Sequence, residues 1–373
     1  MDVLDILDRL VAFPSVAGKP NGDIAGWIEA YLVEHGTQVT LLPGPEGDRS
    51  NLFATIGPAD IPGYILSGHM DVVPAGEPQW SSSPFALRRE GERLYGRGTT
   101  DMKGFLAATL AAVPHLSGLH LARPIHLAFS YDEEIGCRGV PLLIARLPEL
   151  CAKPLGVIVG EPSGMRAVRG HKGKTAARVI VHGRSGHSSR PDLGLNAVHA
   201  MTDVLSTTVS EAERLTHGPF DSSFEPPYSS LQAGVIAGGQ SVNIIPDTCT
   251  LDLEARAIPG VDPAGLLAPI KAKAEACASE GFQIEWTPMS AYPALSLPRD
   301  AALAALLREL TGEPLAAVSY GTEAGLYQAA GFDAIICGPG DIGRAHKPDE
   351  YILASELAAC QRMIEALGTR CAA

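Results

Sequence analysis

Hydrophobic residues along the chain follow two kinds of pattern, one typical of helices and one typical of buried strands. Apolar residues recur at three- and four-residue spacing over residues 3–11 and 23–35, which predicts two amphipathic helices, with Asp23 as the cap of the second. Pro14 and Gly36 follow these two runs and end the helices. Short apolar runs predict buried strands at residues 51–56, 64–66, 125–129, 157–159 and 334–337, and helical patterns occupy residues 102–113, 140–147 and 301–310. Strands that alternate with helices indicate an α/β fold.

The pattern changes between residues 173 and 288. Here the expected elements are, in order, a strand at 175–181, a helix at 195–215, strands at 234–237 and 248–256, a helix at 263–278 with Asp262 as its cap, and a strand at 282–286. This order, βαββαβ, is that of a ferredoxin-like unit. We therefore expect an α/β domain with a mostly parallel mixed sheet flanked by helices, formed by residues 1–172 and 289–373. An α+β domain is inserted at residues 173–288.

Composition and charge narrow the class of protein. Of the 373 residues, 46% are hydrophobic and 19% are charged, which provides for a core and excludes a disordered chain. The formal net charge of −13 opposes binding to nucleic acid or to an anionic membrane. Because no apolar run reaches the roughly 18 residues of a membrane span and the acidic start does not resemble a secretory signal, we expect a cytoplasmic protein. Seven scattered cysteines without a CxxC pair indicate reduced thiols and give little support to a cysteine-based zinc site.

Residues able to bind metal ions follow several of the predicted strands of the α/β part. They are His69, Glu133, Glu134, Glu161 and His346, and Asp101 precedes a predicted helix. Ligands of open α/β sheets bind at the carboxyl ends of the strands, so we expect these side chains to converge. Taken singly, each has an ordinary structural interpretation, as a core histidine, a helix cap or a surface glutamate. Their coincidence at four strand ends favours a metal site.

The types of these residues indicate a two-metal site. Two imidazoles and three carboxylates suffice for two divalent ions when one carboxylate bridges them, and Asp101 is the natural bridge. Nitrogen and oxygen ligands suit Zn²⁺, and also Co²⁺ or Mn²⁺. Asp71 lies two positions after His69, where its carboxylate is expected to accept the other ring N–H and orient the ring. Because adjacent glutamates point in different directions, we assign Glu134 to a metal ion and Glu133 to the general base.

Short motifs between about residue 51 and the C-terminus carry a resemblance to a known family. They are SGHMDVVP, LYGRGTTDMKG, SYDEEIGCRG, VGEPSG, GRSGHSS, VNIIPD and GPGDIGRAHKPDEY. These motifs resemble those of the two-metal aminoacylase and carboxypeptidase superfamily, the M20-type metallopeptidases, and in particular its acetylornithine deacetylase branch. The resemblance implies a metallopeptidase-type catalytic domain and Glu133 as general base. It implies one metal ion bound by His69, Asp101 and Glu161, and a second bound by Asp101, Glu134 and His346. A cis peptide bond is implied between Asp101 and Met102.

The same resemblance assigns residues of the inserted domain. The family uses this domain to form a dimer, and the histidine of its GHSS-type motif, here His187, reaches an active site across the dimer to stabilise the oxyanion. Arg256 resembles the family's residue for the substrate carboxylate. Asn243 resembles a second polar contact to substrate. From the residues alone, His187 is an exposed loop histidine and Arg256 lies on a solvated sheet face.

The reaction implied by the resemblance is removal of the acetyl group from N2-acetyl-L-ornithine, which gives L-ornithine and acetate in arginine biosynthesis. Succinyl-diaminopimelate, another N-acyl amino acid or a dipeptide are alternative substrates of the same machinery, because acyl-chain choice depends on pocket shape. A peptidase for longer peptides is a third alternative, which the role of Arg256 disfavours. A non-catalytic metal-binding module is the alternative of another class, and the complete set of ligands together with Glu133 argues against it.

Overall fold

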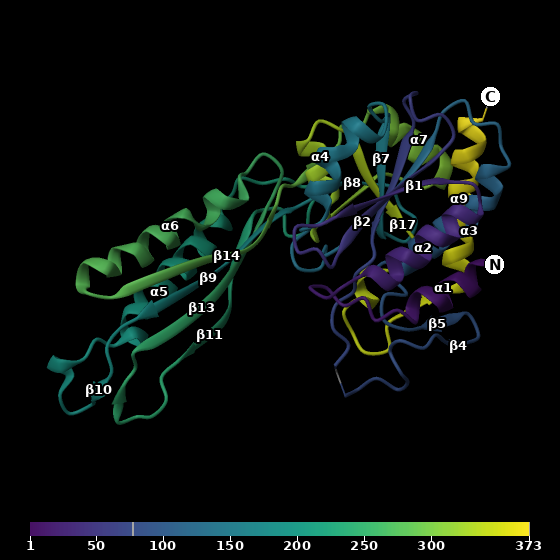
Figure 1. Cartoon of the computed structure of the whole chain (residues 1–373). Coiled ribbons are helices and arrows are strands. Elements are labelled where there is room, and N and C mark those ends of the chain that lie inside the picture. Colours follow the sequence, from purple (N-terminus) through teal and green to yellow (C-terminus); the bar gives the residue numbers. More distant parts are fainter. Residues whose placement is uncertain (77, 373) are drawn as a thin grey trace. The chain divides into compact units, whose positions relative to one another are not determined.

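The chain divides into two units of different architecture (Figure 1). The computed structural model describes residues 1–76 and 78–372. The first unit, here called the α/β unit, comprises Met1–Gly170, Ser296–Ala316 and Thr322–Ala373. The second, here called the inserted unit, comprises His171–Leu295 and Ala317–Gly321. The chain thus leaves the α/β unit after Gly170 and returns to it at Ser296.

The α/β unit is built on a mixed sheet whose central strands run parallel. The strands are β1 (Gln38–Pro43), β2 (Ser50–Ile56), β3 (Tyr64–His69), β6 (Ile125–Ser130), β7 (Gly156–Pro162), β8 (Val168–His171), β15 (Leu295–Ser296), β16 (Ala316–Val318) and β17 (Ala334–Gly338). Their order is β1-β2-β6-β3-β7-β17-β8-β15, and β16 pairs with β8. Strands β6, β3, β7 and β17 run parallel to one another, whereas β1, β2 and β8 pair antiparallel with their neighbours. The carboxyl ends of the four parallel strands therefore lie at the same end of the sheet.

Helices flank this sheet (Figure 1). They are α1 (Val3–Val11), α2 (Gly22–Glu34), α3 (Lys103–Ser117), α4 (Val140–Leu150), α7 (Ala302–Thr311), α8 (Ala324–Ala329) and α9 (Ala354–Cys371). Strands β6 and β7 are buried along their whole length, which explains why they read as continuous apolar runs. Helix α3 is almost entirely buried and packs against α1 and α9. The expected α/β class, with a mostly parallel sheet flanked by helices, is confirmed.

Three helices differ from the sequence expectation, among them α8 (Ala324–Ala329), which no pattern predicted. Helix α2 begins at Gly22, so Asp23 lies inside its first turn and the expected cap at Asp23 is wrong. Asn21 occupies the cap position, but its side chain instead exchanges two hydrogen bonds with the main chain of Ser50. Helix α9 was not predicted. Its buried positions Leu357, Ile364 and Leu367 have helical spacing, so the signal was present in the sequence.

A small antiparallel sheet joins two distant segments of the α/β unit. It consists of β4 (Arg88–Glu90), β5 (Arg93–Tyr95) and β18 (Tyr351–Leu353), with β5 in the centre. Strand β5 leads into the loop before Asp101, and β18 follows the segment that contains His346. The pairing therefore brings these two segments together.

The inserted unit is an antiparallel sheet covered on one face by helices. Its main strands are β9 (Gly173–His182), β11 (Ser230–Gly238), β13 (Thr248–Ala257) and β14 (Gln283–Tyr292), in the order β11-β13-β9-β14. Helices α5 (Ala197–Leu215) and α6 (Pro263–Ala276) pack on this sheet, and Asp262 caps α6 as predicted. Short strands β10 (Gly186–His187) and β12 (Ile244–Ile245) pair with each other beyond it. The element order confirms the ferredoxin-like βαββαβ arrangement.

The alternation along β13 separates a core face from a polar face. Leu251, Leu253 and Ala255 are buried under α5 and α6, while Asp252 and Glu254 point to the other side. A strand with one solvated face alternates in this way, and the inserted unit therefore has a hydrophobic core of its own.

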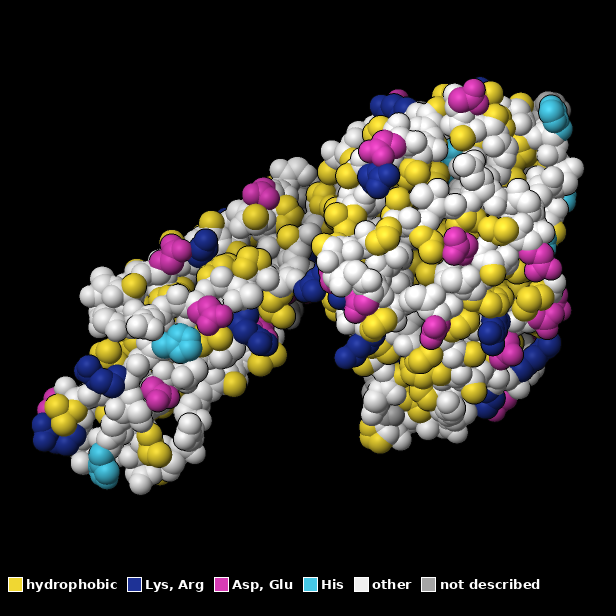
Figure 2. Space-filling model, in the orientation of Figure 1, with side chains coloured by type: hydrophobic (Ala, Val, Ile, Leu, Met, Phe, Trp, Pro, Cys, Tyr) yellow, Lys and Arg dark blue, Asp and Glu magenta, His cyan; other side chains and the backbone are white. Residues whose placement is uncertain are grey.

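The surface carries charges of both signs. On the face that Figure 2 displays, acidic and basic side chains of the α/β unit are interspersed. Within residues 1–76 and 78–372, none of the helices combines the length and the apolar character that crossing a bilayer requires. The cysteines are free thiols, and all of them except Cys151 are buried.

Candidate metal centre and active site

The candidate ligands of the α/β unit come from the ends of its parallel strands. His69 is the last residue of β3, and Glu161 lies in β7 one residue before its end. Glu133 and Glu134 follow β6, and His346 follows β17. Parallel strands end at one end of the sheet, so residues that are far apart in sequence meet there.

Asp101 occupies the centre of this group. Its Oδ1 atom is 3.1 Å from Nε2 of His69, and its Oδ2 atom is 3.1 Å from Nε2 of His346. The peptide bond between Asp101 and Met102 is cis, as the resemblance implied. Each oxygen of this one carboxylate thus faces a different imidazole, which is the arrangement that a bridging ligand requires.

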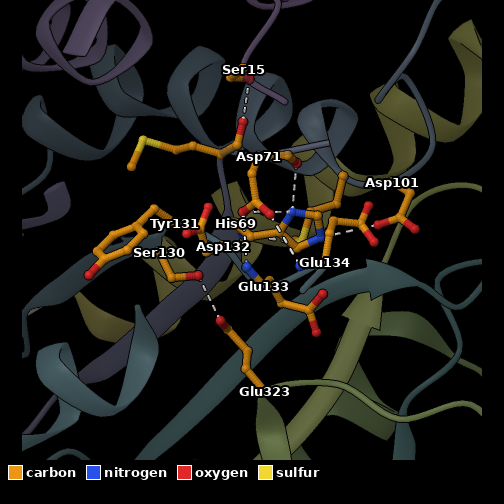
Figure 3. A network of polar contacts seen from close by, with 12 residues as sticks. Ser15, His69, Asp71, Asp101, Ser130, Tyr131, Asp132, Glu133, Glu134 and Glu323 are labelled. Carbon is orange, nitrogen blue, oxygen red and sulfur yellow. Dashed lines mark hydrogen bonds and ion pairs between the residues drawn. The ribbon is translucent and has the colours of Figure 1, made fainter. Parts of the chain in front are cut away.

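Each imidazole also faces a second carboxylate. Oε1 of Glu161 is 3.7 Å from Nε2 of His69, and Oε2 of Glu134 is 3.1 Å from Nε2 of His346. Ligand atoms of His69, Asp101 and Glu134 lie within 4.8 Å of one another, as do those of His69, Glu133 and Glu161. The structure therefore brings together all the metal-binding candidates that the sequence singled out in this unit, and Figure 3 shows most of them.

Asp71 supports the site differently from the sequence expectation. The ring Nδ1 atom of His69 lies 2.9 Å from the main-chain oxygen of Asp71, whereas the closest carboxylate oxygen of Asp71 is 3.7 Å away. The carboxylate instead accepts the main-chain N–H groups of Glu133 and Glu134, each at 3.1 Å (Figure 3). The predicted carboxylate–imidazole hydrogen bond is therefore wrong. One residue nevertheless orients both the histidine ring and the turn that carries the two glutamates.

The electrostatics of the site show an excess of buried negative charge. Burial raises the pKa of Glu133 to about 8 and that of Glu134 to about 7. It also raises the pKa of Glu161 well above its usual range. Hydrogen bonds to Asp101 and Glu134 raise the pKa of His346 to about 10. The carboxylates outnumber the imidazoles, so added cations balance the charge. The nitrogen and oxygen donors therefore fit divalent metal ions.

Two further residues hold the loop that leads to Asp101, and neither was among the candidate site residues. Glu350 is buried and accepts the main-chain N–H groups of Gly98, Thr100 and Asp101 at 2.9–3.1 Å. The buried guanidinium of Arg97 donates to the same carboxylate at 2.9 Å. Both residues lie inside the quoted motifs, but a motif does not reveal which main-chain groups a side chain reaches.

The thiol of Cys137 contacts the expected general base. Its Sγ atom donates to Oε1 of Glu133 at 3.3 Å, and its main-chain N–H donates to the main-chain oxygen of Glu133 at 2.8 Å. The turn after β6 thus fixes the Glu133 carboxylate from its own chain. The spacing of the cysteines predicts only reduced thiols and does not indicate this contact.

The candidates in the inserted unit fall into two places. His187 in β10 is exposed, and its Nδ1 atom accepts hydrogen bonds from the main-chain N–H and the hydroxyl group of Ser189. Asn243 lies beside it, because its main-chain oxygen accepts the N–H of Ser188. Arg256 lies near the other end of β13, where it donates to Glu254 at 2.7 Å and to the Tyr292 hydroxyl at 3.2 Å. The structure therefore places His187 and Asn243 together and Arg256 apart from them.

Comparison with known proteins places the chain in a family. Residues 65–370 match the model of peptidase family M20/M25/M40. The chain is 31% identical to the acetylornithine deacetylase of Proteus mirabilis, over 94% of this chain and 91% of that protein. It is 30% identical to that of Photorhabdus laumondii subsp. laumondii, with coverages of 98% and 96%. The crystal structure of an M20 family metallo-carboxypeptidase from Sulfolobus solfataricus has the same fold, with a TM-score of 0.81, 21% identity and 99% coverage of both chains. The chain therefore belongs to peptidase family M20/M25/M40, as its motifs predicted, and is a metal-dependent hydrolase of amide bonds.

Proposed function

We propose that the chain removes the acetyl group from N2-acetyl-L-ornithine, releasing L-ornithine and acetate, as a step of arginine biosynthesis. The observation that carries the proposal is the Asp101 carboxylate placed between two imidazoles, with Glu133 in a second cluster of ligand atoms that shares His69. The choice of substrate is supported by the curated relatives, which are acetylornithine deacetylases at about 30% identity over nearly the whole chain.

In this proposal the site holds two divalent ions. His69, Asp101 and Glu161 would hold one, and Asp101, Glu134 and His346 would hold the other. The short distances between these ligand atoms support the two sets. We favour Zn²⁺, with Co²⁺ as the alternative, because the donors are imidazole nitrogens and carboxylate oxygens. Bound ions of this kind polarise the amide carbonyl and lower the pKa of water.

Glu133 is the general base of the proposed reaction. Water attacks the carbonyl carbon and gives a proton to the Glu133 carboxylate, which later passes a proton to the nitrogen as the C–N bond breaks. Burial raises the pKa of Glu133 to about 8, which favours retention of the proton between these two transfers. The thiol of Cys137 holds the Glu133 carboxylate, and the carboxylate of Asp71 holds the main-chain N–H of Glu133.

The proposal assigns His187 and Asn243 to the active site of a second copy of the chain. Arg256, the proposed partner of the substrate carboxylate, lies eight residues after Thr248, the start of β13, a length of about 27 Å. A small substrate does not span that distance. The assignments are compatible when Arg256 comes from one chain and His187 with Asn243 from the other, which supports a homodimer.

The edge of the inserted sheet offers a surface for such a dimer. Strand β11 is at the edge, and its residues from Gln232 to Gly238 are exposed, including Val235 and Ile236 at 54% and 52%. Long exposed apolar edge strands are rare in monomers because they pair with other chains. We therefore assign residues 173–288 to a lid and dimerisation domain, and residues 1–172 and 289–373 to the catalytic domain. A cytoplasmic location is part of the proposal and is supported by the free cysteines.

A direct comparison of substrates tests the proposal. The purified protein, loaded with Zn²⁺ or with Co²⁺, is assayed with N2-acetyl-L-ornithine, N-acetylmethionine and succinyl-diaminopimelate at equal concentrations. We expect the highest kcat/KM for acetylornithine. Faster hydrolysis of the succinyl compound would assign the chain to the desuccinylase branch instead. If the protein bound its metal ions but hydrolysed none of the three compounds, the result would favour a non-catalytic metal-binding module.

A further inference from the structure

A buried carboxylate that the mechanism does not use lies beneath the metal-binding candidates. Glu323 directly precedes α8 and is fully buried in the α/β unit. No pattern in the sequence indicates a role for this residue, and the proposed ligand sets do not include it. A buried glutamate is uncommon because removing its charge from water is costly, so its surroundings are informative.

The two oxygens of Glu323 join the strands that carry the site. Oε1 accepts a hydrogen bond from the Ser67 hydroxyl at 2.6 Å, and Oε2 accepts one from the Ser130 hydroxyl at 2.8 Å (Figure 3 shows the second contact). Ser67 lies on β3 two residues before His69. Ser130 ends β6 and is the register partner of His69 in the parallel pairing. One carboxylate therefore fixes the ends of the strands from which His69 and the Glu133–Glu134 turn extend.

The basic side chain that acts on the charge of Glu323 is His69, which lowers its pKa. Among the described residues, its oxygens bond to the two serine hydroxyls, and no Lys or Arg forms an ion pair with it. Burial raises its pKa, while the hydrogen bonds from Ser67 and Ser130 act in the opposite direction. A buried anion of this kind is retained where positive charge lies nearby. The end of the sheet that carries His69 is where the proposed divalent ions would supply that charge.

We propose that Glu323 is a positioning residue of the metal centre, which fixes the ends of β3 and β6 through Ser67 and Ser130 and increases the affinity for divalent cations by its buried negative charge. The inference rests on the proposed function, because it takes His69, Asp101 and their neighbours as metal ligands. Residues that support metal ligands from outside the coordination sphere change metal affinity by about 10- to 100-fold when they are replaced.

The test measures Zn²⁺ affinity rather than activity. The full chain is stripped with a chelator and titrated with Zn²⁺ in competition with a chromogenic chelator. Glu323→Gln keeps the shape of the side chain and removes its charge, and we expect about 10- to 100-fold weaker binding. Tyr327→Phe is the matched control, because the Tyr327 hydroxyl bonds Ser67 at 2.9 Å in the same buried network without carrying charge. We expect its affinity to stay within about threefold of the unmodified chain.

The outcomes separate the possible roles. Equal affinity of Glu323→Gln and the unmodified chain would overturn the inference, and so would equal losses in Glu323→Gln and Tyr327→Phe, since that result shows a role in packing alone. If Glu323→Gln does not fold, as judged by circular dichroism, Ser130→Ala replaces it, and unchanged affinity there overturns the inference. Asp101→Asn tests the proposed site itself. Its failure to weaken Zn²⁺ binding would reject the ligand assignment, whereas a loss only in Asp101→Asn would reject only the role of Glu323.

Discussion

The two units of this chain present their candidate functional residues in opposite ways. In the α/β unit, His69, Asp101 and Glu161 are at most 5% exposed, and they meet at the ends of parallel strands that are buried on both faces. His346 is the exception, because its side chain is 51% exposed, but it contacts Asp101 and Glu134 of the same group. In the inserted unit, His187 and Asn243 are exposed and lie beyond the end of an antiparallel sheet. The side chains of the first group contact one another within one chain. Among the described residues, His187 and Asn243 form side-chain hydrogen bonds with Ser189 and Ser241 of their own loops.

This difference in burial indicates which part of the proposed reaction each unit can carry out within one chain. Buried carboxylates and imidazoles are costly unless each is paired or holds a cation, so their convergence within one chain indicates a metal centre. The exposed His187 carries no such cost and bonds to Ser189 of its own loop, so a role in the reaction requires that something else is brought to it. The α/β unit therefore contains the proposed chemistry, and in the proposed reaction the inserted unit acts at the site of a second chain.

The largest expected effect comes from a substitution that stops the proposed reaction in the α/β unit but leaves the proposed metal ligands in place. Replacing Glu133 with Ala removes the proposed general base but none of the proposed metal ligands. We expect kcat for acetylornithine to fall by about 10²- to 10⁴-fold, since that is what general base catalysis contributes. Metal analysis should still find close to the metal content of the unmodified chain. Substantial activity in this variant would remove Glu133 from the mechanism, and Glu149→Ala on the exposed surface is the control.

The next effect tests whether the inserted unit acts across a dimer. We expect His187→Ala to lower kcat by about 10²- to 10³-fold, the range for loss of an oxyanion donor, with unchanged metal content. Coexpression of the His187→Ala and Glu133→Ala chains produces mixed dimers in which one of the two sites has both residues. Random pairing should restore about a quarter of the unmodified activity. Mixtures without any recovery would show that His187 acts within its own chain or not at all.

A smaller effect examines how the α/β unit holds its ligands. Asp71→Asn keeps the main-chain oxygen that faces His69 but replaces one of the carboxylate oxygens that accept from Glu133 and Glu134 by an amide group. We expect Zn²⁺ affinity to fall by about 10- to 100-fold. Competition with a chelator measures this change, and Asp60→Asn at an exposed position is the control. An affinity equal to that of the control would show that the glutamate turn keeps its place without this carboxylate.

The smallest effect concerns stability and separates the core of the α/β unit from its metal centre. His126 on β6 is fully buried, and burial lowers its pKa to about 4 from an ordinary value of 6.5. Between these values the unfolded chain binds a proton that the folded chain does not, so this group adds stability above pH 6.5 and loses it as the pH falls towards 4. We expect a loss of about 2 kcal/mol between pH 7.5 and pH 5 from this residue.

Urea unfolding of the unmodified chain and of His126→Asn at these two pH values measures the difference. Between pH 7.5 and pH 5, the free energy of unfolding of the variant should fall by about 2 kcal/mol less than that of the unmodified chain, whatever the stability of the variant at neutral pH. Because both chains keep the same metal ligands, effects of acid on the metal centre cancel in the comparison. If the two chains lost equal stability at pH 5, the loss would come from the carboxylate cluster and not from His126.

The sequence by itself determined much of the fold and the composition of the site. Periodicity located the parallel strands, because helices on both faces force continuous apolar runs, and the alternation along β13 identified a sheet with one solvated face. The positions of His69, Glu134, Glu161 and His346 after strands predicted their convergence. That inference succeeds because the carboxyl ends of parallel strands share one end of the sheet.

Tertiary structure alone decided which atoms meet. Spacing along the chain places Asp71 near His69, but it does not show that the main-chain oxygen rather than the carboxylate faces the ring. Glu350 and Glu323 reach their partners across more than 190 residues, and no local pattern encodes such contacts. Hydrogen-bond partners depend on direction and distance to within a fraction of an ångström, whereas hydrophobic patterning fixes only which face of an element is buried.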